Sequence, residues 1–166
     1  MGVFLNGRRF SANSKAASVQ KSLMFWNAPS FISVPCDNYE EKFNQCIDCW
    51  AQLRRTCCQP PFTVSTVRIG NSIMTTLAQL AVGRVDLCVE TCCHLAHIVS
   101  AILLMEESGG IATDLYGNKI DISKLLSSNE EGSPKMTTLI AGANREVVQF
   151  AADLCKKENY GAFWNM

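Results

Sequence analysis

Residues 85–113 read VDLCVETCCHLAHIVSAILLMEESGGIAT, and this stretch decides the fold. The segment Val85–Val89, which leads to Glu90, predicts a short strand. Apolar residues then recur at helical spacing: Leu95, Ile98, Ile102 and Met105. They predict a helix that packs one stripe against a core, and Gly109-Gly110 offers the backbone freedom with which helices end. Ile111–Thr113 predicts another strand, so the stretch forms a strand–helix–strand unit.

The same alternation of strands and helices extends toward the N-terminus. Val3–Phe10 alternates around Asn6-Gly7, which predicts a hairpin with a type I′ turn. The apolar run Ser22–Trp26 predicts a buried strand. Asn38 is expected to cap a helix through residues 39–55, which Pro60-Pro61 ends. One face of this helix is apolar: Phe43, Cys46, Ile47, Trp50 and Leu53.

The segments on either side of the central stretch continue the pattern. The β-branched run Thr63–Ile69 predicts a strand. Asn71 or Ser72 is expected to cap a helix that continues to Val82 and ends near Gly83.

Beyond residue 113, a turn at Tyr116–Asn118 predicts a further hairpin, with Asp114 and Asp121 as turn formers. Met136–Ile140 predicts a strand, and Asn144 is expected to cap a last helix. Strands therefore alternate with helices throughout, which predicts an α/β layered sandwich with a mixed sheet and flanking helices.

Length and composition limit the possible functions. The 166 residues fit a single domain, 1–166, which buries enough surface for a stable core. Lys+Arg and Asp+Glu number 15 each, so no excess of positive charge points to nucleic acid or to an anionic membrane. The sequence has no run of about 20 apolar residues and no signal peptide pattern, so a cytoplasmic protein without a membrane span is expected.

Nine cysteines are many for a chain of this size. Their odd number and adjacent pairs argue against a disulfide framework and favour reduced, packed thiols. A zinc site made from Cys46, Cys49, His94 and His97 with the paired cysteines remains an alternative, although the spacing matches no zinc-finger pattern.

Four segments resemble the inositol monophosphatase family. These are GVFLNGRRFSAN (2–13), RIGNSIMTTLAQLAVGRVDLCVE (68–90), HLAHIVSAILLMEESGGIATDLYGNKID (94–121) and TTLIAGANREV (137–147). The block with GG-x-x-TD-x-x-G is the most specific of them. Order and spacing agree over nearly the whole chain, but only with the C-terminal half of the family, which hydrolyses phosphomonoesters such as inositol monophosphate with Mg²⁺.

The resemblance also implies where the site residues lie. Glu90 matches a glutamate that accepts hydrogen bonds from substrate hydroxyls, and Ser72 matches a loop that contacts the sugar, in which Ile73 stands where the family has a smaller alanine. His97 stands at the position of a metal-binding aspartate. Imidazole is a neutral nitrogen donor that suits Zn, Cu or Ni better than Mg²⁺. In the family, most of the magnesium is held by a Glu-Glu pair and an Asp-Pro-Leu-Asp-Gly-Thr motif that both precede the segments matched here, and the Asp-Pro-Leu-Asp-Gly-Thr motif does not occur in the sequence.

The resemblance therefore implies an inositol monophosphatase-like protein that acts on a small sugar or inositol phosphate. We expect it to be truncated relative to the family and impaired in catalysis, with no catalytic residue assigned and no Mg²⁺ bound by this chain alone. The alternative is a non-catalytic interaction module that pairs with a full-length paralogue. A homodimer or a paralogue heterodimer is the expected assembly, with no nucleic-acid partner and no membrane partner.

Overall fold

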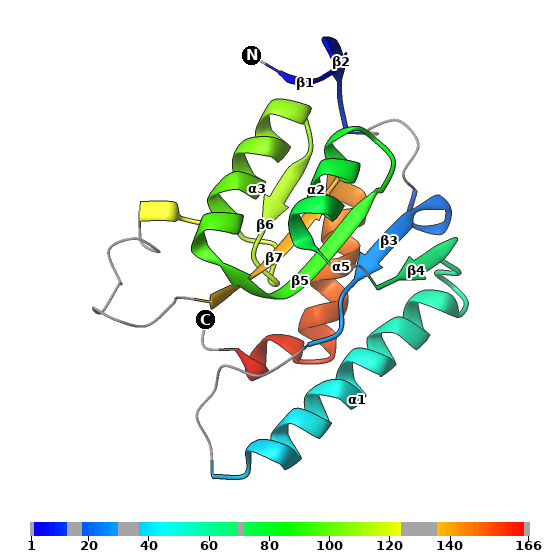
Figure 1. Ribbon diagram of the computed structural model, residues 1–166. Coiled ribbons are helices and arrows are strands. Elements are labelled where there is room, and N and C mark those ends of the chain that lie inside the picture. Colours follow the sequence, from blue (N-terminus) through cyan, green and yellow to red (C-terminus); the bar gives the residue numbers. More distant parts are fainter. Residues whose placement is uncertain (1, 13–17, 30–36, 70–71, 124–135, 165–166) are drawn as a thin grey trace.

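The computed structural model describes residues 2–12, 18–29, 37–69, 72–123 and 136–164. A five-stranded sheet in the order β4-β3-β5-β7-β6 forms its centre (Figure 1). Its strands are β3 (Leu23–Trp26), β4 (Thr66–Arg68), β5 (Leu87–His94), β6 (Ile111–Thr113) and β7 (Met136–Gly142). The helices are α1 (Tyr39–Cys58), α2 (Ile73–Ala81), α3 (Leu95–Ser108) and α5 (Arg145–Lys157). The structure thus confirms the predicted α/β sandwich with a mixed sheet.

The order of the strands places a topological switch at β3. Strand β3 pairs in parallel with β4 on one side and with β5 on the other, whereas β7 runs antiparallel to both β5 and β6. The connection from β3 to β4 passes through α1, and the connection from β4 to β5 passes through α2. The first crossover runs from β3 to β4, and the second runs back across β3 to β5, so right-handed connections place α1 and α2 on opposite faces of the sheet.

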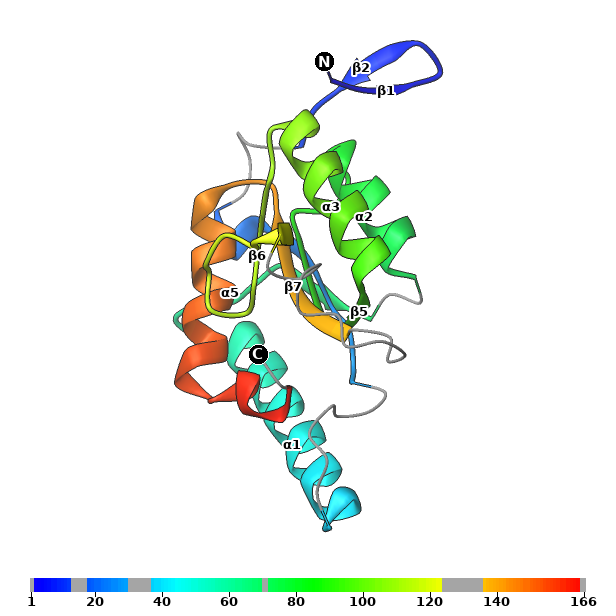
Figure 2. The ribbon, with the colours of Figure 1, turned by 90° about the vertical axis from the view of Figure 1, so that its left-hand side faces the viewer.

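The helices accordingly form two layers around the sheet. Figure 2 shows α2 and α3 side by side on one face, with α5 on the other face and α1 below it. Side chains of β5 alternate between the layers: Leu87 packs near Gly142 and α5, so Cys88 and Glu90 point toward α2 and α3. The largest side chains of the core are fully buried: Trp26, Tyr160, Met24, Leu53, Leu77, Leu80, Leu87, Ile98, Met105, Leu115, Leu139 and Ile140.

The N-terminal hairpin stands apart from the main sheet. Strands β1 (Val3–Leu5) and β2 (Arg8–Phe10) pair antiparallel and form a separate two-stranded sheet. Positive φ angles at Asn6 (51°) and Gly7 (76°) confirm the predicted turn, because a type I′ turn requires both. Phe4 and Leu5 on this hairpin are exposed.

The expected helix ends are confirmed at α2, α3 and α5, whereas the side-chain cap expected at α1 is wrong. The Ser72 hydroxyl accepts a hydrogen bond from the Thr75 N–H, and the Asn144 side chain accepts one from the Val147 N–H, so these residues cap α2 and α5. Gly109 adopts the left-handed conformation at the end of α3. Asn38 precedes α1, but its side chain makes no capping hydrogen bond, since its φ and ψ of −108° and 52° lie outside the usual cap region.

Three strand predictions needed correction. Thr63 has a positive φ of 46°, so β4 begins only at Thr66 instead of at residue 63. Strand β5 extends past Glu90 to His94, because pairing with β7 resumes after a register shift between Glu90 and Cys93. The turn after Thr113 forms, with the Asp114 carboxylate accepting from two backbone N–H groups, but β6 pairs with the distant β7 and does not form the expected hairpin.

Two other observations complete the fold. A short 3-10 helix at Tyr160–Phe163 (η2), which the periodicity does not predict, packs against α1 and α5. Among the helices of the described ranges, none combines the length and apolar character needed to cross a bilayer. The polar sequence SSNEEGS (127–133) predicts a loop, and it lies outside the described residues.

Candidate functional site

The carboxyl ends of β3, β4 and β5 form the edge of the sheet where a ligand site is expected. In open α/β sheets, ligands bind in the crevice outside the carboxyl ends of the strands at the switch point, which is β3 here. Asn27 directly follows β3, and Glu90 lies next to it on β5, because Trp26 and Val89 are paired residues of the two strands. Residues 30–36 and 70–71 lie outside the described residues.

Glu90 is the most perturbed carboxyl group at this edge. Its side chain is largely buried, and the Asn27 side-chain amide donates a hydrogen bond to its carboxylate. Burial raises the pKa of Glu90 from an ordinary 4.5 to about 7, and the Asn27 hydrogen bond opposes this rise. Its pKa is not lowered by any cation in the described ranges. Glu90 is therefore divided between its neutral and ionised forms at physiological pH.

Asn27 is the residue of this site that the sequence analysis did not identify. Its backbone N–H donates to the Val89 carbonyl at 3.2 Å, so the backbone of β3 fixes it beside Glu90. A signal was available: Asn27 is the first polar residue after the apolar run Leu23–Trp26, and such residues gather at the carboxyl edge of a parallel sheet. Only the pairing of β3 with β5 shows that its partner is Glu90.

Ser72 lies at the same edge but serves a different cavity. It caps α2 and is exposed, and one strand, β3, separates β4 from β5, a distance of roughly 10 Å. Ser72 lines a groove of about 440 Å³ along α2 that Glu90 does not line. The other lining residues are Leu23, Phe25, Arg68, Thr75, Thr76, Gln79, Arg84 and Val85. Ile73 packs against the hydrophobic core and does not line this groove.

His97 lies in the first turn of α3, half-buried, and its ring stands edge-on to that of His94 with 5.8 Å between the ring centroids. Mg²⁺ prefers six oxygen ligands in octahedral geometry, whereas these residues offer imidazole nitrogens. Within the described ranges, no group of three or more His, Cys, Asp or Glu side chains has the arrangement of a metal site. The donor set at the start of α3 therefore does not fit Mg²⁺.

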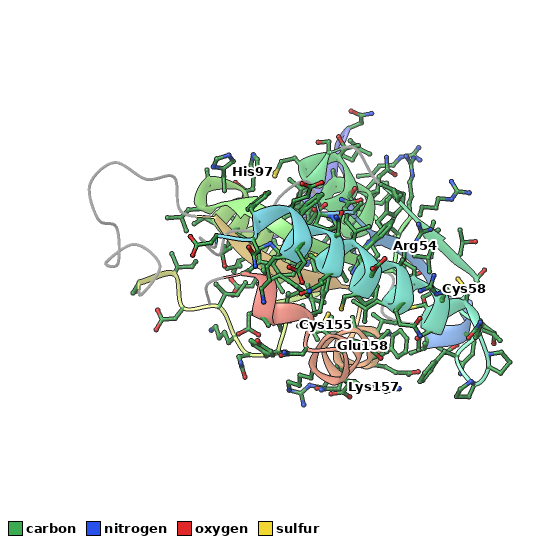
Figure 3. The ribbon with its side chains drawn as sticks, turned by 90° about the horizontal axis from the view of Figure 1, so that it is seen from below. Arg54, Cys58, His97, Cys155, Lys157 and Glu158 are labelled. Atoms are coloured by element: carbon green, nitrogen blue, oxygen red, sulfur yellow. The ribbon has the colours of Figure 1, made fainter. Side chains whose placement is uncertain are left out.

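The cysteines of α1 and α5 lie in a different layer from the histidines, whereas Cys88 and Cys93 lie on β5 with His94. Cys49 and Cys57 on α1 approach Cys155 on α5, and Figure 3 shows His97 far from Cys155 and Cys58. Burial raises the pKa of Cys49 to about 11 and that of Cys57 to about 12, so these thiols remain protonated. The structure thus does not bring the α1 cysteines of the alternative zinc site together with its histidines, and packing explains the described cysteines except Cys58, which is exposed.

Comparison with known proteins identifies the fold. No family model matches the sequence, and no curated protein sequence matches it. Among solved structures, inositol monophosphatase II of Staphylococcus aureus with bound inositol monophosphate superposes with a TM-score of 0.65 at 13% identity. The match covers 98% of this chain and 52% of that chain.

Two further structures give the same result. Inositol monophosphatase from Anabaena matches with a TM-score of 0.66 at 18% identity, over 95% of this chain and 51% of that one. The extragenic suppressor protein SuhB from Bartonella henselae matches with a TM-score of 0.62 at 20% identity, over 94% and 49%. The chain thus has the fold of inositol monophosphatases and spans about half the length of the solved structures that it matches.

Proposed function

We propose that this chain is an inositol monophosphatase-like protein that binds a small polyol or inositol phosphate at the carboxyl edge of its sheet and hydrolyses it poorly or not at all. The observation that carries this proposal is the Glu90–Asn27 pair. It stands at the switch point of a fold whose solved example in Staphylococcus aureus has inositol monophosphate bound. Glu90 is also the residue that matches the substrate-binding glutamate of the family.

The chemistry of Glu90 suits a hydroxyl-rich ligand. An ionised carboxylate accepts hydrogen bonds from hydroxyl groups, and a neutral carboxyl group also donates one. With a pKa of about 7, Glu90 offers both forms near neutral pH, and a polyol hydroxyl can donate or accept in response. Asn27 holds the carboxyl group in place. Ser72 is proposed as a second contact because its hydroxyl lies at the same edge, one strand away.

Impaired catalysis follows from the donors that the chain offers. The resemblance implies hydrolysis that depends on Mg²⁺ held by carboxylates, and the position of one of these carboxylates is His97. Among the described residues, no group of three or more His, Cys, Asp or Glu side chains supplies a replacement set of ligands. We therefore derive no hydrolytic step for this chain and assign it no catalytic residue.

Calorimetric titration with inositol 1-phosphate, with and without Mg²⁺, tests both parts of the proposal. We expect weak binding that does not need Mg²⁺, and no lithium-sensitive phosphate release above background. Glu90→Ala should weaken binding at least tenfold, because a buried hydrogen-bonding partner of the ligand is lost. Glu106→Ala, which removes an exposed carboxylate in the last turn of α3, is the matched control and should leave binding unchanged. Rapid phosphate release by the purified chain would refute impaired catalysis, and equal binding by both variants would refute the role of Glu90.

A second function, that of an interaction module, is favoured by a separate observation. Val99 and Leu103 on α3 are exposed apolar residues, 38% and 60% accessible, and they lie one turn apart on the same face of the helix. Contiguous exposed apolar surface marks interaction sites. Co-elution with a full-length relative tests the pairing that the resemblance implies. Separate elution of the two chains at micromolar concentration would refute that pairing.

A further inference from the structure

The groove of about 440 Å³ along α2 is not used by the site at Glu90. Its volume lies within the roughly 300–1,000 Å³ of ordinary ligand sites. Strand β3 forms its floor with the half-buried side chains of Leu23 and Phe25, and α2 forms one wall. Figure 1 shows β3 and β4 on the side of α2 that faces away from α3. The groove is therefore an open surface with apolar side chains at its base.

Two arginines give this groove its charge. Arg68 ends β4 and is the strand partner of Phe25, so its side chain emerges on the same face of the sheet as the floor. Arg84 lies between α2 and β5, at the other end of the groove. Both arginines are exposed, and among the described residues neither guanidinium has a hydrogen bond or ion pair. No carboxylate is among the described lining residues, so the groove is cationic on a chain of zero net charge.

We propose that this groove binds an extended acidic peptide segment of a partner protein, with one apolar side chain between two carboxylates. Charge complementarity selects the carboxylates, because each arginine lacks an anionic partner within the described residues. The apolar floor of Leu23 and Phe25 selects the side chain between them. The inference goes beyond the function proposed above. It does not rest on the ligand of Glu90, which does not line the groove.

The separation of the two arginines fits such a segment. Strand β3 lies between β4 and β5, so the backbones of Arg68 and Arg84 are about 10 Å apart across the sheet. Along the strands, Arg68 is level with Phe25, whereas Arg84 precedes Asp86, which is level with Leu23. This offset brings the separation to roughly 12–16 Å. In an extended chain, residues i and i+4 are about 13 Å apart and face the same side as residue i+2. A Glu-x-Leu-x-Glu pattern therefore matches the two arginines and the floor.

The edge of β4 favours recognition by side chains over the addition of a strand. Arg54 of α1 donates from Nη2 to the Val67 carbonyl in the middle of this three-residue strand, at 3.1 Å. A strand that paired with β4 would compete with this hydrogen bond. Thr75 and Gln79 line the groove one helical turn apart on α2. Their hydroxyl and amide groups are placed to hydrogen-bond with the backbone of a peptide that lies between the two arginines.

An NMR titration of the isotope-labelled chain with the peptide Gly-Glu-Ser-Leu-Ser-Glu-Gly tests the proposal. We expect shifts of backbone amides in β3, β4 and α2, and binding that weakens as salt is added, because salt screens exposed ion pairs. Peptides in which Ser replaces Leu, or Gln replaces both Glu, should each bind about fivefold more weakly or less. These two peptides leave the protein unchanged, so their effect cannot come from misfolding.

The matched protein variants remove the charges of the groove. Arg68→Ala combined with Arg84→Ala should weaken binding by about fivefold or more. Arg55→Ala removes an exposed arginine of α1, which lies on the other side of the sheet from α2 (Figure 2), and should bind like the original chain. Unchanged amide spectra away from the substitutions show that the variants are folded.

Several results would overturn the proposal. One is a titration that shifts no amide of β3, β4 or α2, and another is equal binding by the double arginine variant or by the Gln peptide. An equal loss in Arg55→Ala would reduce the effect to a general response to charge. Tighter binding of a single-stranded oligonucleotide at the same amides would assign the groove to nucleic acid. Displacement of the peptide by inositol 1-phosphate would make the groove part of the Glu90 site. Peptide binding by a chain that does not bind inositol 1-phosphate would refute only the function proposed for Glu90.

Discussion

The two helical layers of this protein differ on their outer faces and agree on their inner faces. On α5, every exposed position is polar: Arg145, Glu146, Gln149, Asp153, Lys156 and Lys157. Helix α1 likewise exposes charged and amide side chains along most of its length. The outer faces of α2 and α3, by contrast, expose alanine, valine, leucine and small hydroxyl residues. Water therefore solvates one layer well, whereas the other has the composition of a surface that meets another protein.

The inner faces show no such difference. Leu53 on α1 and Leu77 on α2 are both fully buried, and each packs against the sheet within a single hydrophobic core. Both layers thus contribute to folding in the same way. The contrast between the outer faces concerns what the folded molecule contacts and not what holds it together.

The largest expected effects come from the inner faces and test whether the layers are equally integrated. Leu53→Ala and Leu77→Ala should each lower the free energy of unfolding by about 2–5 kcal/mol, because each removes buried methyl groups and leaves a cavity. Urea denaturation followed by circular dichroism measures both. We expect the two losses to agree within about 1 kcal/mol.

A much smaller loss for Leu77→Ala would break the comparison. It would mean that α2 packs loosely on the sheet until something covers its outer face. Repeating the measurement at several protein concentrations separates this possibility from self-association, since dimerisation makes the midpoint depend on concentration.

The second-largest effect concerns the ionisation of Glu90. Glu90 points toward α2 and α3, and burial raises its pKa to about 7 without a neighbouring cation to lower it. The folded chain therefore binds more protons than the unfolded chain between pH 4.5 and 7. The Glu90 contribution to the free energy of unfolding is then highest below pH 4.5 and falls as pH rises to about 7.

Glu90→Gln measures this contribution. We compare the free energy of unfolding of the variant with that of the original chain at each pH. Between pH 4 and pH 8 this difference should shift by about 2–3 kcal/mol in favour of the variant, because the variant removes the cost of a buried charge. Urea denaturation at a series of pH values provides the measurement. Glu106→Gln, at an exposed position, should show no such trend. Parallel curves for Glu90→Gln and the original chain would mean that Glu90 is solvated in solution.

The sequence predicted the elements of both layers but not the contrast between them. Helices α2 and α3 are recognisable from the spacing of Leu77, Ile98, Ile102 and Met105 and from their end signals at Ser72 and Gly109. Periodicity shows which positions face inward. It does not show which outward positions the other described residues leave exposed, because that depends on where the strands place each helix.

The candidate site was predictable to a similar degree. The resemblance identified Glu90, and the strand that leads to it was expected, but the environment of the carboxyl group depends on a long-range contact. Asn27 is 63 residues away in sequence and reaches Glu90 only because β3 and β5 are parallel neighbours. The extension of β5 to His94 also depended on its pairing with β7, since local β-propensity reflects such pairing.

The smallest effects concern the N-terminal cap of one helix from each layer. The Asn144 cap of α5 is half-buried and accepts from the Val147 N–H at 3.2 Å, whereas the Ser72 cap of α2 is exposed and accepts from the Thr75 N–H at 3.4 Å. Replacing a cap by alanine costs about 1 kcal/mol, and a shorter, less solvated bond costs more to lose. We therefore expect Asn144→Ala to destabilise the chain by about 1 kcal/mol and Ser72→Ala by less, as measured by thermal unfolding.

Asn38→Ala is the matched control, because Asn38 precedes α1 without a capping hydrogen bond, and its midpoint should not change. If Ser72→Ala destabilised the chain more than Asn144→Ala, the start of α2 would be less solvated than its exposure indicates. The outer face of α2 would then already be covered at that end.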